Sequence, residues 1–153
     1  MFRYASDVTV ARPASEVFAG VVDIGRWGEW TDMRDIRQDE SGPIRLGSTG
    51  TFTMPGPFRG PIRYELTGLQ PGRQVTYRIQ HPRFTWTAVM GVASEGSESR
   101  LSTSGEFRLH GLRRLLQPIV AREVSRGEAG ELERLKAILE SAPAAATPAA
   151  SPS

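Results

Sequence analysis

Cysteine is absent from the 153-residue sequence, lysine occurs once and histidine twice. The absence of cysteine excludes disulfide bonds, thiolate metal sites and cysteine nucleophiles. The two histidines have no further histidine or carboxylate at the spacing of a metal site, so we expect neither a metal nor a cofactor. No apolar run approaches the roughly 18 residues of a membrane-spanning helix, and the first residues have no apolar signal-peptide core. We therefore expect a cytoplasmic protein without an integral membrane segment.

A large excess of one charge is also missing. The sequence has 19 basic and 17 acidic residues, and the acidic residues lie among the arginines. Because the basic surplus is small, nucleic acid is not an expected partner. Every basic residue except Lys136 is arginine, a bias typical of GC-rich bacterial genomes. With 39% hydrophobic residues, a chain of this length can form one domain that buries roughly 68–70% of its unfolded surface.

The first part of the chain predicts a strand followed by two short helices. Residues 3–11 alternate between apolar and polar side chains, which is typical of a half-buried strand. Pro13 suits the first position of a helix, where its missing N–H is not needed. Asp23 can cap a second, short helix that carries Trp27 and Trp30.

Strand and turn signals then alternate along the middle of the chain. The predicted strands cover residues 31–38, 49–54, 62–67, 75–80, 84–92 and 101–109. Their short connections, such as the turn at Pro71-Gly72, favour antiparallel pairing of neighbouring strands. Each strand has one apolar face, and a sheet of this kind must cover that face with another element.

The predicted cover is an amphipathic helix of about 30 residues over Gly111–Glu140. Its apolar side chains recur at steps of three and four residues: Leu112, Leu115, Leu116, Ile119, Val120, Val124, Leu132, Leu135 and Leu139. Pro118 should kink or restart the helix. Gly127 and Gly130 weaken it, and they either leave room above the sheet or are merely tolerated. Residues 142–153 are Ala, Pro, Ser and Thr, which predicts a disordered tail after a domain that covers residues 1–141.

Several short motifs occur in a characteristic order between residues 3 and 140. They are Arg-Pro-Ala-Ser-Glu-Val-Phe at 12–18, Asp23 followed by Trp27-Gly-Glu-Trp30, Gly47 before a strand, Gln70-Pro-Gly-Arg73, Phe107-Arg-Leu-His-Gly111, and Leu132-Glu-Arg-Leu-Lys136 followed by Ile138-Leu139-Glu140. With this order of elements, the chain resembles the START and polyketide-cyclase superfamily, also called SRPBCC. The resemblance implies the α+β helix-grip fold: a curved antiparallel sheet of six to seven strands, two short helices after the first strand, and a long C-terminal helix over the sheet. It also implies a deep cavity for an apolar ligand, but it carries no catalytic residue over to this chain.

The apolar strand faces and the last helix supply the candidate cavity residues. They are Trp30, Phe52, Met54, Tyr64, Tyr77, His81, Phe84, Trp86, Met90, Phe107, Val120, Val124 and Glu131. Aromatic and methionine walls suit a flat or irregular apolar ligand. The same residues would equally form a filled core, and Trp27 and Trp30 would then close one end of the sheet rather than gate a cavity.

Candidate polar groups have two interpretations each. His81 is either a general acid or base at the cavity mouth, or a turn residue that Pro82 places in solvent. Glu128 and Glu131 either lie on a solvated helix flank or face the cavity, where burial raises a carboxyl pKa and permits proton transfer, with Glu131 and Tyr77 as the candidates.

A basic cluster marks the start of the last helix. It comprises Arg108, Arg113, Arg114, Arg122 and Arg126. It is either a solvated face or a surface for an anionic head group or a membrane.

Three functions remain open from sequence alone. The first is a carrier or sensor that binds a small hydrophobic or amphipathic, lipid-like or polyketide-like molecule. The second is a polyketide cyclase or dehydratase that uses an acid-base residue in the cavity. The third is a packed module with a vestigial cavity. A monomer and a homodimer are both compatible with the sequence.

Overall fold

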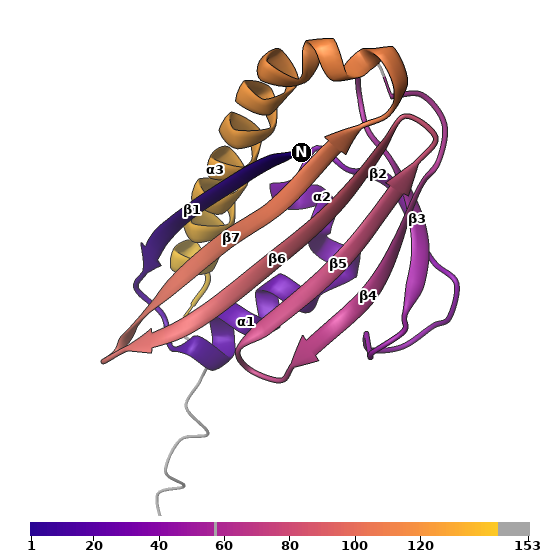
Figure 1. Ribbon diagram of the computed structural model, residues 1–153. Coiled ribbons are helices and arrows are strands. Elements are labelled where there is room, and N and C mark those ends of the chain that lie inside the picture. The colour runs from indigo at the N-terminus through magenta and orange to yellow at the C-terminus, as the bar shows by residue number, and fades with distance from the viewer. Residues whose placement is uncertain (57, 144–153) are drawn as a thin grey trace, which may run out of the picture.

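The computed structural model describes residues 1–56 and 58–143 (Figure 1). Its strands are β1 (Phe2–Val10), β2 (Arg34–Gln38), β3 (Thr49–Thr53), β4 (Ile62–Gln70), β5 (Gln74–His81), β6 (Phe84–Glu95) and β7 (Glu98–Leu109). Its helices are α1 (Ala14–Val22), the 3-10 turn η1 (Ile24–Arg26), α2 (Trp27–Trp30), the 3-10 helix η2 (Gly111–Leu116) and α3 (Gln117–Ser141). Of the tail predicted over residues 142–153, residues 144–153 lie outside the described part of the chain.

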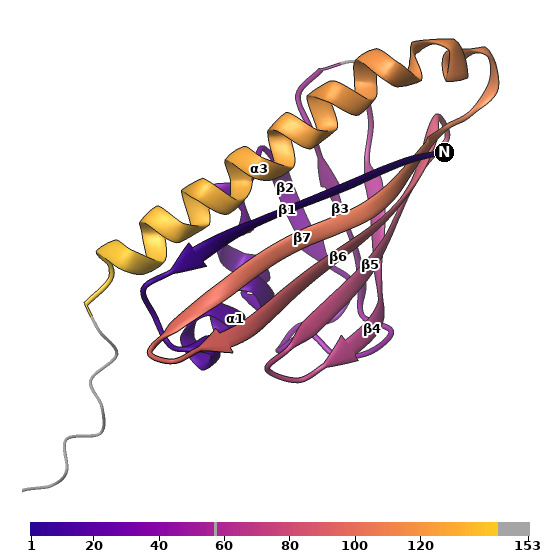
Figure 2. The same ribbon diagram turned by 60° about the vertical axis from the view of Figure 1, so that its left-hand side comes forward.

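The seven strands form one antiparallel sheet in the order β1-β7-β6-β5-β4-β3-β2. Neighbouring strands in the chain pair with one another from β2 to β7, whereas β1 pairs with the last strand, in register from Phe2 opposite Phe107 to Val10 opposite Ser99. The sheet curves around α3, which packs chiefly along β1 and β7 (Figure 2). The predicted helix-grip fold is confirmed.

The strand predicted over residues 31–38 begins only at Arg34. Thr31 instead ends α2: its hydroxyl donates to the Trp27 carbonyl oxygen at 2.7 Å and accepts from the Met33 N–H at 3.1 Å. These two side-chain hydrogen bonds compete with strand pairing for the backbone groups of the segment. They place Thr31 and Met33 beside the sheet rather than in it.

The first turns of the predicted C-terminal helix do not cover the sheet. Pro118 lies in the first turn of α3, where a proline is accommodated, and the residues before it form η2. A 3-10 helix has three residues per turn, so its side chains leave the stripe that a 3.6-residue period would align. The prediction that this part of the apolar stripe packs on the sheet is wrong: its side chains are 52–88% exposed and comprise Leu112, Leu115, Leu116 and Ile119.

The other end of α3 is fixed to the start of the chain. The Ala11 N–H donates to a Glu140 carboxylate oxygen at 2.7 Å, and the Arg12 guanidinium donates to the Glu140 carbonyl oxygen at 2.8 Å. Lys136 donates to the Thr9 carbonyl oxygen. In the middle of α3, a Cβ at Gly127 would meet no other atom within 4 Å, so packing does not require glycine there.

Candidate functional site

A cavity lies between the concave face of the sheet, α2 and α3. Its lining is aromatic and aliphatic with a few polar groups: Trp27, Trp30, Thr31, Met33, Phe52, Tyr64, Tyr77, Ile79, Trp86, Ala88, Met90, Thr103, Glu128 and Glu131. About 40 Å³ is open to the centre of a water-sized sphere. One water molecule needs roughly 10–15 Å³ on this measure, so the cavity has room for about three. Hollows of about 470 and 550 Å³ lie elsewhere and are more open to solvent.

The structure brings seven of the thirteen sequence-predicted residues together around this cavity. These are Trp30, Phe52, Tyr64, Tyr77, Trp86, Met90 and Glu131. The other six do not line it: Met54, His81, Phe84, Phe107, Val120 and Val124. Phe84 and Phe107 stack on each other in the core at 5.0 Å between ring centroids, and Phe107 also contacts the ring of Trp86. Phe107 thus packs against the cavity-lining Trp86 without lining the cavity itself. A ligand-binding role for any of these residues remains a prediction.

His81 is buried in a hydrogen-bonded turn. Its Nδ1 accepts from the Arg83 N–H at 3.1 Å, so Nε2 carries the proton and donates to the Arg59 carbonyl oxygen at 3.0 Å. The ring stacks on Phe84 at 5.1 Å. Because the side chain is only 8% exposed, the interpretation that Pro82 places it in solvent is wrong. Both ring nitrogens are occupied by backbone groups and the imidazole holds the turn.

Two tryptophans shape the cavity differently. Trp27 donates its indole N–H to the Val21 carbonyl oxygen at 3.0 Å and packs edge-on against Tyr64 and Tyr77, at 5.6 and 5.2 Å between centroids. Trp27 therefore has the packing of a core plug, although one side of it faces the cavity. Trp86, on β6, donates its indole N–H to the Tyr4 hydroxyl at 2.8 Å. Tyr4 is on β1, and β7 lies between these two strands, so the hydrogen bond spans β7 and fixes the indole ring.

Three buried polar groups on residues that line this cavity lack a hydrogen-bond partner within the described part of the chain. They are the indole N–H of Trp30 and the hydroxyl groups of Tyr64 and Tyr77, and all three residues are buried. Burial raises the pKa of both tyrosines, so their hydroxyls stay protonated at neutral pH. A buried polar group without a partner costs about 1–3 kcal/mol. A bound molecule or water with an accepting oxygen would offset this cost.

A pair of carboxyl groups lies on the α3 side of the cavity. Glu128 is 7% exposed, and the Thr103 hydroxyl donates to its Oε2 at 3.0 Å. Burial raises the pKa of Glu128 to about 7, with the hydrogen bond from Thr103 acting in the opposite direction. Burial and the nearby Glu128 charge hold the pKa of Glu131 well above its usual range, which Arg134 partly offsets. The Glu128 carboxyl can therefore take up or release a proton near neutral pH.

Arg134 fixes one rim of the cavity. This side chain, one turn after Glu131 on α3, donates to the Trp30 carbonyl oxygen at 2.8 Å and approaches Asp32 at 3.9 Å. This links α3 to the end of α2, so the indole of Trp30 and the carboxyl of Glu131 come from elements that are fixed to each other.

The residues that sequence reasoning missed fall into two groups. Ile79, Ala88 and Thr103 share the inward face of their strands with predicted residues, and a lone threonine on the apolar face of β7 is the signal that could have identified Thr103. Thr31 and Met33 enter the lining from the segment after α2, whose geometry depends on the Thr31 hydrogen bonds.

The described residues contain no group of three or more histidine, cysteine or carboxylate side chains that could hold a metal ion. Over the same ranges, no helix has the length and apolar character needed to cross a membrane.

Comparisons with known proteins agree with this geometry. A family model described as polyketide cyclase / dehydrase and lipid transport matches residues 1–140. No curated protein sequence is significantly similar to the chain.

Solved structures share the fold at low sequence identity. A protein of Thermus thermophilus has a TM-score of 0.74 at 10% identity, over 90% of this chain and 96% of its own. An aromatase/cyclase of a Streptomyces species has a TM-score of 0.71 at 18% identity, over 90% of this chain and 93% of its own. Truncated norcoclaurine synthase of Thalictrum flavum has a TM-score of 0.69 at 10% identity, over 92% of this chain and 94% of its own. At these identities the likeness shows the fold alone.

Proposed function

Because the chain belongs to the polyketide cyclase / dehydrase and lipid transport family, we propose that it binds a small, mainly apolar molecule in the cavity between the sheet and α3. The molecule carries at least one oxygen that accepts hydrogen bonds. The observation that carries this proposal is the set of partnerless donors on residues of the mainly aromatic lining, the Trp30 indole and the Tyr64 and Tyr77 hydroxyls. A keto or hydroxyl oxygen would accept from them while the rings contact the apolar body.

The cavity must open to admit such a molecule. Its 40 Å³ is well below the 300–1,000 Å³ of typical ligand sites, even allowing for the different measure of volume. Met33 and Met90 are partly buried in its lining and have flexible, unbranched side chains. Rotation of these two side chains would provide the first increment of space.

Native mass spectrometry of freshly purified protein, followed by denaturing extraction, tests this proposal directly. A stoichiometric small molecule supports it and identifies the ligand class. If the protein is ligand-free, thermal shift against fatty acids, sterols and aromatic polyketides follows. No bound molecule and no shift with any of the three classes would contradict the proposal and favour a packed module.

Replacing Ala88 by leucine is expected to abolish ligand binding. Ala88 lines the cavity on β6, and three added carbon atoms would fill most of the open volume. Because space exists, the variant should lose no more than about 1–3 kcal/mol of stability, the usual cost of overpacking. Isothermal titration with the ligand identified by extraction, or with the compound giving the largest shift, measures the binding loss.

The matched control is Ala93→Leu, which lies on the same strand but is exposed. It should leave binding and stability nearly unchanged. Binding that survives Ala88→Leu at full affinity would place the ligand elsewhere. Unfolding of the variant would indicate that the core is already filled.

The carboxyl pair favours a second function, cyclisation and dehydration of a poly-β-ketone. A carboxylate of the pair would take a proton from a carbon between two carbonyls, and a carboxylic acid would protonate the ketone oxygen that this carbon attacks. The new C–C bond forms a β-hydroxyketone. Removal of a second α-proton and protonation of the leaving hydroxyl then release water.

Replacing Glu131 by glutamine should lower turnover of a β-hydroxyketone to its dehydrated product by about 10²–10⁴-fold, the usual contribution of general acid-base catalysis. Product formation is followed by absorbance of the new conjugated double bond. Glu133→Gln, an exposed position on the same helix, is the control and should retain activity. Equal turnover by the two variants would exclude Glu131 as the acid-base residue. No turnover by the unmodified protein would leave ligand binding without chemistry as the function.

A further inference from the structure

An exposed apolar surface surrounds the junction of η2 and α3. We define this η2 patch by its apolar residues Leu112, Leu115, Leu116 and Ile119 and its basic residues Arg108, Arg113, Arg114 and Arg122. The leucines at 112 and 115 are 88% and 83% exposed, and Ile119 is 66% exposed. Large apolar side chains gathered at this exposure on one segment indicate an interaction surface. In Figures 1 and 2 the segment lies at one end of the molecule, past the end of β7.

The η2 patch is strongly basic. Residues 107–122 contain four arginines and no aspartate or glutamate. Within the described chain, none of these four arginines forms an ion pair. The two nearest acidic residues are paired with arginines outside the η2 patch, Glu106 with Arg3 at 2.9 Å and Glu123 with Arg126 at 3.7 Å. The positive charge of the η2 patch is therefore uncompensated.

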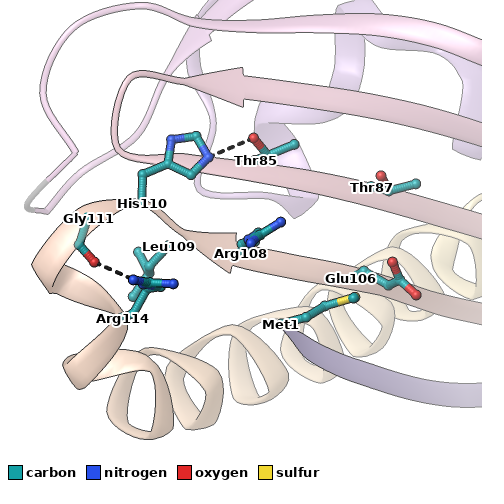
Figure 3. A pocket seen from close by; sticks show the side chains of 9 residues that line it. All are labelled: Met1, Thr85, Thr87, Glu106, Arg108, Leu109, His110, Gly111 and Arg114. Carbon is teal, nitrogen blue, oxygen red and sulfur yellow. Dashed lines mark hydrogen bonds between the residues drawn. The ribbon is translucent and has the colours of Figure 1, made fainter.

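An open hollow of about 470 Å³ adjoins the η2 patch on the outer face of β6 and β7 (Figure 3). Arg108 and Arg114 both line it, as does the side chain of Met1, which is 66% exposed. His110 is hydrogen-bonded to the Thr85 hydroxyl at 2.9 Å, and Arg114 uses only its Nε to donate to the Gly111 carbonyl oxygen at 3.3 Å. The remaining guanidinium nitrogens of Arg114 are available to an anionic group.

We propose that the η2 patch docks the protein onto an anionic lipid bilayer. The leucines and Ile119 would insert at the level of the head groups, and the arginines would contact lipid phosphates and other anionic head groups. This combination is typical of interfacial segments, in which an apolar face and basic residues act together. The inference does not depend on the identity of the cavity ligand.

A second copy of the chain fits this surface poorly. A symmetric dimer would bring two identical patches together and place four arginines of one copy against four of the other. A stable interface also uses about 20–30 residues from each partner, whereas the η2 patch comprises eight. An anionic bilayer would bury the apolar side chains and neutralise the arginines, and binding to it does not require shape complementarity.

Flotation of the full chain with vesicles tests the proposal. Vesicles of phosphatidylcholine alone are compared with vesicles containing 30% (about one lipid in three) phosphatidylglycerol, at low and at high salt. We expect at least tenfold stronger binding to the anionic vesicles at low salt, and loss of most of it at high salt. Leu112→Ser with Leu115→Ser, and separately Arg113→Glu with Arg114→Glu, should each weaken binding at least tenfold.

Two control variants match these changes at other exposed positions. Leu46→Ser removes a leucine that is 64% exposed, and Arg34→Glu with Arg37→Glu reverses two exposed charges on β2. Both should bind as the unmodified protein does. Failure to bind anionic vesicles, or equal binding by the patch and control variants, would overturn the proposal. Dimerisation in light scattering that the paired leucine change abolishes, without vesicle binding, would assign the η2 patch to self-association instead.

Discussion

Replacing Glu128 by glutamine is expected to raise the stability of the protein above neutral pH and to flatten its dependence on pH. Burial raises the pKa of the Glu128 carboxyl in the folded state to about 7, whereas the unfolded chain has a value near 4.3. Between these values the folded state retains a proton that the unfolded state has released. Stability therefore falls as pH rises through this window, and it levels off above the folded pKa.

The size of the effect follows from the same two values. Each unit of pKa difference corresponds to about 1.4 kcal/mol, so ionising Glu128 costs the folded state about 4 kcal/mol. The cost is smaller if Glu131 keeps its proton and accommodates the charge. Glutamine keeps the shape of the neutral acid and never ionises. At pH 8 the Glu128→Gln variant should unfold several degrees higher than the unmodified protein, at about 2–4 °C per kcal/mol for a chain of this size.

Thermal unfolding at half-unit intervals from pH 4 to pH 8.5 measures this. The two curves should coincide near pH 4, where Glu128 is protonated in both folded and unfolded states, and diverge upward from there. Glu133→Gln on the exposed face of α3 is the matched control and should follow the unmodified protein throughout. Parallel curves for Glu128→Gln and the unmodified protein would contradict a raised Glu128 pKa and would remove the physical basis for proton exchange at the site.

Much of the architecture could be predicted because the sequence repeats one local signal many times. Alternation along each strand and short turns between them specify an antiparallel sheet with one apolar face, and the last helix is the only long apolar stripe available to cover it. The failure at η2 has a local cause. Leu112 and Leu115 keep the helical spacing, but Pro118 begins a new helix and the preceding residues adopt a 3-10 conformation that turns them into solvent.

The sequence predicted the aromatic nature of the cavity lining, but not which residues line it. The alternation along the strands assigned Tyr64, Tyr77 and Trp86 to the inward face, and all three line the cavity. It assigned Phe84 and Phe107 to the same face, but these two residues stack on each other in the core and do not line the cavity. The alternation of side chains along a strand tells which face of the sheet a residue occupies. It does not tell whether that residue lies beside the cavity or farther along the same face. Glu128 was visible only as one of two carboxylates beside an apolar stripe. In the folded protein its buried carboxylate accepts a hydrogen bond from Thr103, which lies 25 positions earlier in the chain.

The glycine at position 105 is expected to tolerate no side chain. Gly105, on β7, lies opposite Tyr4 on β1 and opposite Ala88 on β6. A Cβ there would lie 2.6 Å from the Tyr4 hydroxyl and would collide with the carbonyl oxygen of Thr87 in the neighbouring strand. A glycine within a strand often marks such a close approach of another group. Gly105→Ala should therefore destabilise the protein by about 3 kcal/mol, at the upper end of overpacking costs.

This change should also affect the cavity, because the Tyr4 hydroxyl that it displaces accepts the hydrogen bond from Trp86. Urea unfolding gives the stability, and near-ultraviolet circular dichroism of the folded variant reports the loss of a fixed Trp86 environment. The matched control is Gly91→Ala on β6, where the nearest atom to a new Cβ is the mobile Ser102 hydroxyl at 3.0 Å. A side chain of this kind can rotate away, whereas the Thr87 backbone cannot move without shifting the strand. Equal destabilisation by the two alanines would mean that β7 has room to shift, and that the Tyr4–Trp86 hydrogen bond does not depend on the close approach at Gly105.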